Sequence, residues 1–287
     1  MPLANYAFYT GAILFVVADA LQKTTSKGVL TWRYLSKRSV YTSIVSIVAT
    51  IIIYGFHTFP SISIAVQIAL CSFCCGLGLL FYIKAVNSLK FSNVGSLAII
   101  GNVINHLSGL LLFHEKLQRL DLLCFGLMSF GCVFQLIYSP NLRGAKYVIF
   151  SSFFWTMGYV LLSYVLKQTP NVYWSVPIME VSVLVMSIFV SYFFYKNEVL
   201  PDEERLSSVK GRLVLLLIAV FIYFASLLNN YAFQQLPLTT VNFFQLSLMP
   251  IGYLLSLKIF KERPTKVELI SFLTGFAGFA LFIFTHK

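Results

Sequence analysis

Long runs of apolar residues, separated by short polar segments, fill almost the whole chain. A helix needs about 20 mostly apolar residues to cross the hydrocarbon core of a bilayer. By this measure the pattern predicts ten transmembrane helices, at residues 4–21, 39–56, 63–83, 95–113, 120–138, 147–166, 174–195, 213–233, 239–259 and 267–284. No connection between them is long enough to form a separate soluble domain.

The chain also contains an internal repeat. Residues 85–131 align with residues 232–278 at a constant offset of 147 positions, without a gap, and 11 of the 47 pairs are identical. Composition alone would give about four identities. One identical pair is Glu115 and Glu262, and each glutamate is followed by a basic residue. The sequence therefore predicts two copies of one unit, residues 1–140 and 141–287.

Each copy contains five predicted helices. Because five is odd, the second copy must enter the membrane from the opposite side. The fold expected is an all-α membrane protein of ten transmembrane helices, arranged as two inverted five-helix repeats. Inverted repeats are typical of secondary transporters, whose solute site lies near mid-membrane at the repeat interface.

Composition agrees with a chain surrounded by lipid. Hydrophobic residues make up 58% of the chain and charged residues only 11%, where a soluble domain carries about a quarter. The five cysteines lie in apolar runs, which favours packing over metal or redox chemistry. We expect no metal and no cofactor. The net charge of +11 comes from basic residues between the apolar runs, so we expect no nucleic-acid partner.

The basic residues predict the orientation in the membrane. Seventeen of the 21 lysines and arginines fall on one side of the ten-helix arrangement, and four on the other. Basic loops tend to stay in the cytoplasm. Both termini are therefore expected outside the cytoplasm, in a multi-pass protein of a bacterial cell (inner) membrane.

Several short motifs occur in the same order in both copies. They are Tyr82-x-x-Ala85, Phe113-His114-Glu115-Lys116-Leu117, Gly126 and Gly131 in the first copy, and Tyr231-Ala232, Met249-Pro250, Glu262-Arg263, Gly275 and Gly278 in the second, with Arg38 near the start of the second predicted helix. This order resembles the drug/metabolite transporter superfamily in its EamA-like ten-helix form. Two features depart from the family pattern: Gly101-Asn102 stands where proline is common, and many members have both termini in the cytoplasm.

The resemblance implies a carrier and not an enzyme. It also implies a central cavity lined by helices 1, 3, 4, 6, 8 and 9. Family solutes include amino acids, nucleotide-linked sugars, sugar phosphates, polyamine-like cations and drugs, and nothing at family level selects among them.

Polar residues at mid-span are the first candidates for a solute site, because an unpaired polar group in hydrocarbon costs several kcal/mol. The candidates are Asn102, Asn105 and His106 in the fourth helix, and Asn242, Gln245 and Met249 in the ninth. The alternative role for the amides is helix–helix hydrogen bonding, and for the histidine a packed core position. Pro250 should kink the ninth helix, either as a hinge or as a static bend.

Further candidates come from aromatic and acidic positions. Tyr82 aligns with Asn229, and Trp155 and Tyr159 lie four residues apart, where they form either a cavity wall or a lipid-facing stripe. Glu180 and Asp19 are acids within predicted helices. Glu180 could couple transport to protons or pair with a cationic solute; Asp19 could do the same, or pair with Lys23 one turn away.

Together these features predict a secondary transporter of a small polar metabolite that works by alternating access around the cavity. The expected partners are that solute and the bilayer, with proton or exchange coupling, in a monomer or homodimer. The alternatives are a membrane receptor or scaffold, and an intramembrane enzyme, although the sequence has no HExxH, GxSxG or GxxxxGK[ST] motif.

Overall fold

The structure of the protein is a computed structural model, which describes residues 2–97, 99–115, 119–138, 144–194, 206–241, 248–263 and 265–285. All regular elements in these ranges are helices. They are α1 (Pro2–Ser26), α2 (Thr31–Tyr54), the 3-10 helix η1 (Phe56–Thr58), α3 (Ile62–Ser88), α4 (Phe91–Leu97), α5 (Ile99–Leu112), α6 (Arg119–Tyr138), α7 (Ala145–Lys167), α8 (Ser175–Phe194), α10 (Val209–Gln235), α12 (Leu248–Lys258) and α13 (Lys266–Thr285).

Within these ranges, six helices are long and apolar enough to cross a membrane: α1, α2, α3, α7, α8 and α10. Shorter apolar stretches at Ile100–Leu112 and Leu122–Gly131 coincide with the fourth and fifth predicted helices. The ninth predicted helix includes residues 242–247, which lie outside the described residues. The chain is thus a helical, multi-pass membrane protein, and the total of ten crossings stays a prediction.

Several helices extend beyond the apolar runs that predicted them. α2 begins at Thr31, where position 39 was expected, so Arg33, Lys37 and Arg38 belong to its first turns. Hydropathy misses such turns because it detects the hydrocarbon-spanning part of a helix and not its polar ends. α10 begins just after Ser208, whose side chain accepts a hydrogen bond from the Gly211 amide and caps the helix.

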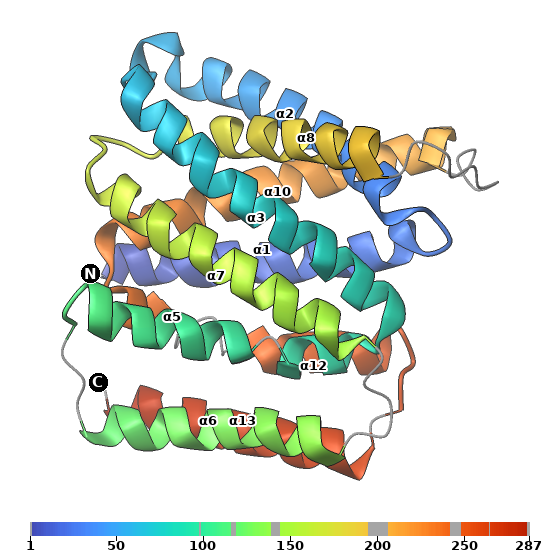
Figure 1. Cartoon of the computed structure of the whole chain (residues 1–287), viewed down its shortest axis with the longest axis vertical. Helices are drawn as coiled ribbons and strands as arrows, with labels where there is room; N and C mark the ends of the chain where they lie inside the picture. The colour runs from blue at the N-terminus through green and yellow to red at the C-terminus, as the bar shows by residue number, and fades with distance from the viewer. Residues whose placement is uncertain are drawn as a thin grey trace.

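The closest helix pairs join the first half of the chain to the second. α3 packs against α7 and α1 against α10, while α2 packs against α8 and α6 against α13. In Figure 1 the helices form successive layers, with α2 and α8 at one edge and α6 and α13 at the other. The two halves are therefore interlocked, and neither buries its apolar surface alone.

Two glycines separated by 147 positions allow these close crossings. A Cβ atom on Gly11 of α1 would lie 2.9 Å from the carbonyl oxygen of Ala225 on α10. A Cβ atom on Gly158 of α7 would lie 2.9 Å from the carbonyl oxygen of Cys71 on α3. Each glycine thus lets two backbones approach at a distance that a side chain would prevent.

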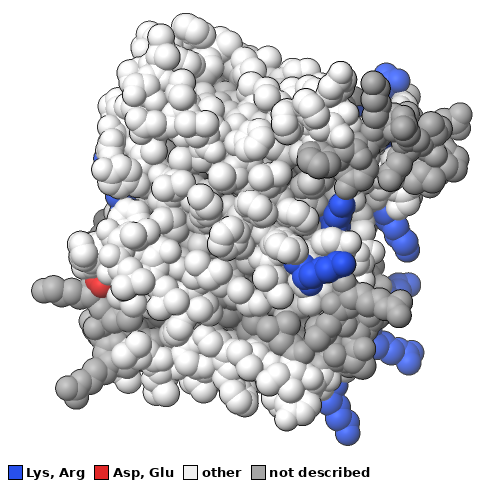
Figure 2. All heavy atoms as spheres, in the orientation of Figure 1, with Lys and Arg blue, Asp and Glu red and all other residues white. Residues whose placement is uncertain are grey.

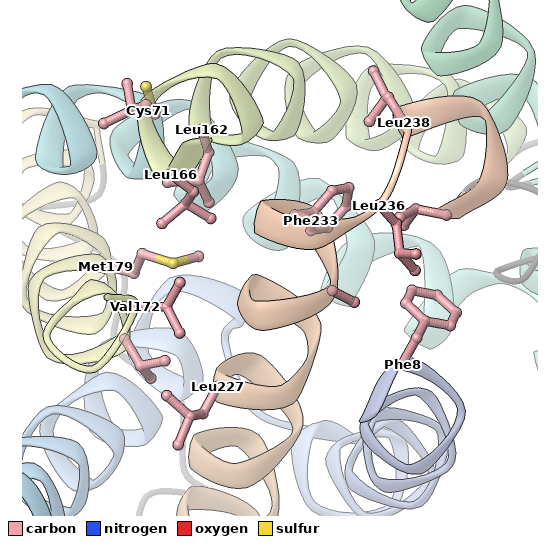
Figure 3. Close-up of a cluster of buried hydrophobic side chains, with 14 of the residues drawn as sticks. Phe8, Cys71, Leu162, Leu166, Val172, Met179, Leu227, Phe233, Leu236 and Leu238 are labelled. Atoms are coloured by element: carbon pink, nitrogen blue, oxygen red, sulfur yellow. The ribbon is translucent and has the colours of Figure 1, made fainter. Parts of the chain in front are cut away.

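The largest apolar cluster lies where five helices from both halves meet. Figure 3 shows Met179, Val172 and Leu227 grouped on one side of α10, and Phe8 near Leu236 on its other side. Cys71 of α3 and Leu162 and Leu166 of α7 belong to the same cluster. Cys71 is buried within this apolar cluster, which agrees with its expected packing role.

The outer surface is apolar along the helices and basic at one end. Large side chains such as Ile52 and Leu111 are 75% and 72% exposed, as expected of residues that face lipid. In Figure 2 most of the visible lysine and arginine side chains gather at the right-hand end of the molecule. A basic end and an apolar belt are what a membrane-embedded bundle requires.

Candidate functional site

A cavity of about 300 Å³ lies among the helices. All six helices expected from the resemblance contribute to its wall, as α1, α3, α4 with α5, α7, α10 and α12. α2, α8 and α13 also contribute, which the expectation did not include. The cavity is therefore enclosed by residues from both halves of the chain.

The structure brings most of the predicted site residues together in this wall. Those that line the cavity are Asp19, Tyr82, Asn102, Asn105, Trp155, Tyr159, Glu180 and Asn229. Asn242 and Gln245 lie outside the described residues. Met249 and Pro250 fall in the first turn of α12, and whether the ninth helix is kinked depends on the adjoining residues 242–247, which are not described.

Glu180 is engaged by an ion pair, and it is not a free carboxylate. Its Oε2 accepts hydrogen bonds from Arg38 Nη1 at 2.9 Å and from Thr42 Oγ1 at 2.5 Å. The two charged side chains are only 4% and 9% exposed. The sequence does not reveal this pair, because its partners are 142 positions apart and Arg38 lies in a turn of α2 that precedes the predicted apolar run. The pair joins α2 to α8 at the wall of the cavity.

Asp19 has neutral hydrogen-bond partners. Its Oδ1 accepts from Gln22 Nε2 at 2.9 Å, and the Tyr82 hydroxyl also bonds to it. The expected alternative, a pair with Lys23, is wrong, because Lys23 bonds to Glu262 instead. The ring of Tyr82 lies 5.2 Å from that of Trp155. A carboxylate and two aromatic rings thus form one continuous side of the cavity.

Another part of the cavity wall is made of amides and small residues. Asn102 and Asn105 line it from α5, and Asn105 is 5% exposed with no hydrogen-bond partner for its Oδ1. Thr156 of α7 donates to the Gly101 carbonyl oxygen at 3.1 Å and holds α5 against α7. This part of the wall therefore presents one buried acceptor, Asn105 Oδ1, that no described donor of the protein uses.

His106 does not line the cavity. It is buried against Phe125, with ring centroids 4.9 Å apart, as the packed-histidine alternative describes. The positions 147 residues later are Tyr253 and Phe272, which stack at 4.4 Å and do line the cavity. The repeat offset could have pointed to Tyr253 as a candidate, since it stands where the first copy has His106.

Glu115 and Glu262 join the two halves at opposite ends of the bundle. Glu115 accepts hydrogen bonds from the backbone amides of Leu238 at 2.7 Å and Thr239 at 2.9 Å. Glu262 accepts from the backbone amide of Phe91, at 2.9 and 3.1 Å. Phe91 precedes Leu238 by the same 147 positions that separate the glutamates, so each carboxylate caps a matching helical turn of the other half, at residues 238–241 and at the start of α4.

The loops that carry these glutamates also match. The residues just before them, His114 and Lys261, have φ angles of 53° and 51°. The Glu115 amide donates to Gly109 O and the Glu262 amide to Ser256 O, both at 3.1 Å. Each glutamate is therefore held by backbone amides of the other half.

Glu262 has an additional cationic partner. Lys23 Nζ lies 2.7 Å from its Oε1, and Ser256 Oγ donates to Oε2 at 2.5 Å. Burial acts to raise the pKa of Glu262, but hydrogen bonds from Lys23, Ser256 and the Phe91 amide outweigh it and hold the pKa below its usual value. The carboxylate is therefore ionised and fixed at neutral pH.

Comparison with known proteins identifies the family. The profile of the EamA-like transporter family matches residues 140–284, half of the chain. The chain belongs to the EamA-like transporter family. Its members are membrane transporters of the drug/metabolite type, which agrees with a helical bundle around a cavity that is lined in part by polar side chains. No curated protein matches the sequence.

Solved structures share the fold of this EamA-like chain. Among 28 matching chains, one crystal structure superposes with a TM-score of 0.67 at 14% sequence identity, covering 97% of both chains. At this identity the likeness shows the fold alone. The fold is thus shared along nearly the full length, while the solute has to be argued from the cavity.

Proposed function

We propose that this protein is a secondary, non-ATP-driven transporter that carries a small polar metabolite through the central cavity by alternating access. The observation that carries the proposal is the cavity itself, where charged, amide and aromatic side chains from both halves meet between apolar helices. Such groups are costly inside a membrane unless they bind something.

The reciprocal contacts support a description as two inverted five-helix repeats, residues 1–140 and 141–287. Each helix of one half packs against a helix of the other, and Glu115 and Glu262 cap matching helices at opposite ends. In inverted-repeat carriers, rocking of one bundle against the other exposes a fixed site to each side in turn. Both termini are proposed to lie outside the cytoplasm of a bacterial inner membrane, because the basic end would face inward.

The test is transport by purified protein in liposomes. The liposomes are loaded with a ¹³C-labelled bacterial metabolite extract, and the labelled compounds that leave are identified by mass spectrometry. We expect at least one small polar solute to leave faster than from protein-free liposomes. Asn102→Ala should slow it about tenfold, as expected for the loss of one well-used hydrogen bond.

Leu111→Ala is the matched control, because Leu111 lies on the same helix and is 72% exposed to lipid. Its transport should equal that of the unchanged protein. Solute efflux no faster than from protein-free liposomes would support the receptor or scaffold alternative. A chemically altered product in place of the loaded compound would support the intramembrane enzyme. Equal transport by Asn102→Ala would refute the assignment of the site.

A further inference from the structure

The charged groups of the cavity do not balance. Arg38, Glu180 and Asp19 are the charged side chains that line it among the described residues. The Arg38 guanidinium is hydrogen-bonded to Glu180, and the two charges cancel. Asp19 forms no ion pair with any described residue, although Arg38 attracts it through space. Asp19 is therefore one carboxyl group more than the described cations of the cavity wall can pair with.

Two buried oxygen atoms in the same wall lack a hydrogen-bond donor. They are Gln22 Oε1 and Asn105 Oδ1; the residue Gln22 is 2% exposed and the residue Asn105 is 5% exposed. The orientation of the Gln22 amide is fixed, because its Nε2 donates to the Asp19 carboxylate. A buried acceptor without a donor costs about 1–3 kcal/mol. Gln22 and Asn105 both line the cavity, so the N–H groups of a solute bound against these residues are candidates for the missing donors.

Aromatic rings surround the same carboxylate. Phe15 precedes Asp19 by one helical turn and lines the cavity on the same face of α1. Tyr82 bonds to Asp19 and lies against Trp155. The faces of aromatic rings attract cations, and more strongly where water is excluded. An anion would meet repulsion from Asp19 and from the ring faces together.

We propose that the cavity selects a small primary amine in its protonated form, with the ammonium group bound by Asp19, Gln22 and Asn105. This inference rests on the proposed carrier function and names its solute class. An –NH₃⁺ group has three donors and no acceptor, which matches one carboxylate and two unused carbonyl oxygens. The cavity of about 300 Å³ equals roughly ten water volumes, so the solute has about ten non-hydrogen atoms.

The experiment measures stabilisation of the full-length protein in detergent by matched probes. They are benzylamine, benzyl alcohol and benzoate, with butylamine, butanol and butyrate as an aliphatic series, all at equal ionic strength in a sodium-free buffer. A ligand that binds the folded state raises the apparent Tm. We expect both amines to raise Tm, and the alcohols and carboxylates to leave it unchanged.

Variants separate the proposed subsite from general effects of charge. Asp19→Asn keeps the size and one acceptor but removes the charge, and should weaken amine binding at least tenfold. Asn105→Ala should weaken it about fivefold, which provides a second test if Asp19→Asn fails to fold. Glu268→Gln is the control: Glu268 is a buried carboxylate outside the cavity, paired with Lys90, and its removal should leave amine binding unchanged.

Four results would overturn the proposal. Two concern the probes: no stabilisation by either amine, or stabilisation by the alcohols or carboxylates. The third is undiminished amine binding in both Asp19→Asn and Asn105→Ala, and the fourth is stabilisation by sodium chloride alone, which would indicate a site for an inorganic cation. The failures are distinguishable from failure of the carrier function. Efflux of a neutral or anionic metabolite would keep the carrier and refute the amine. Amine binding without any efflux would keep the subsite and refute the carrier.

Discussion

Replacing Glu262 by alanine should destabilise the protein more than the same change at Glu115, its counterpart 147 positions earlier. Both glutamates cap a helix of the other half through backbone amides. Glu262 in addition pairs with Lys23 and accepts from Ser256. The two side chains of the ion pair are only 15% and 14% exposed, so water replaces little of what is lost.

The expected magnitudes follow from these partners. Glu115→Ala removes a cap from two amides, which costs about 1–2 kcal/mol. Glu262→Ala removes a cap and also leaves a largely buried ammonium group without its anion, which costs about 3–5 kcal/mol. At roughly 2–4 °C of Tm for each kcal/mol, the apparent Tm should fall by about 4 °C for Glu115→Ala and about 10 °C for Glu262→Ala.

The assay is thermal unfolding of purified protein in detergent, followed by tryptophan fluorescence between pH 7 and pH 3. The pKa of Glu262 is lower when folded than its ordinary value of 4.5. Its contribution is therefore complete above about pH 4.5 and is lost as the pH falls through the folded pKa. Glu262→Gln should lack this part of the acid sensitivity. A Glu115→Ala variant as unstable as Glu262→Ala would refute the reasoning.

Three further predictions concern the packing of the helices. Glu180→Gln or Arg38→Met alone should lower the free energy of unfolding by about 3–5 kcal/mol, because each leaves the partner as an unpaired buried charge. The double variant leaves no such charge, so its loss should be clearly smaller than the sum of the two single losses. A double-mutant cycle of Tm values measures this, and additive losses would contradict it. Thr42→Val removes a hydrogen bond to Glu180 and should lower the free energy of unfolding by about 1–2 kcal/mol. An unchanged Tm would contradict this prediction. Gly11→Leu should prevent folding or lower Tm strongly, while Gly126→Leu, where a Cβ meets nothing within 4 Å, should be tolerated.

The helices and much of the cavity wall could be predicted because both signals are local in sequence. Apolar length reveals a membrane helix wherever it occurs, and the 147-residue offset aligns the halves without any structure. Polar residues such as Asn102 and Asn229 were found because hydrocarbon tolerates few of them. The same argument named His106, which lies against Phe125 instead; sequence spacing cannot tell the cavity face of a helix from a face packed on its neighbour.

The ion pairs could not be predicted, because their partners are distant in sequence. Arg38 and Glu180 are 142 positions apart, and Lys23 and Glu262 are 239 apart. Sequence reasoning pairs a charge with the nearest opposite charge, such as Lys23 with Asp19 one turn earlier. The structure separates these two, because the end of α1 lies beside the loop between α12 and α13. Only the crossing of the two halves brings such partners together.

The two ends of the bundle differ in one respect that bears on transport. Lys23 lies 4.8 Å from the ring of Phe260, and Lys167 lies 5.0 Å from the ring of Phe113, the matching position in the first half. Lys23 also reaches Glu262, whereas Lys167 forms no ion pair with any described residue, Glu115 included. The end that holds Lys23 is therefore fastened by a charge that the other end lacks. If the halves rock as proposed, the Lys23–Glu262 bond must break before that end opens. Lys23→Met should then speed opening at that end. The test uses Ser226→Cys, which places a cysteine in the cavity wall. A membrane-impermeant maleimide applied from that side should label this cysteine faster in Lys23→Met/Ser226→Cys than in Ser226→Cys alone.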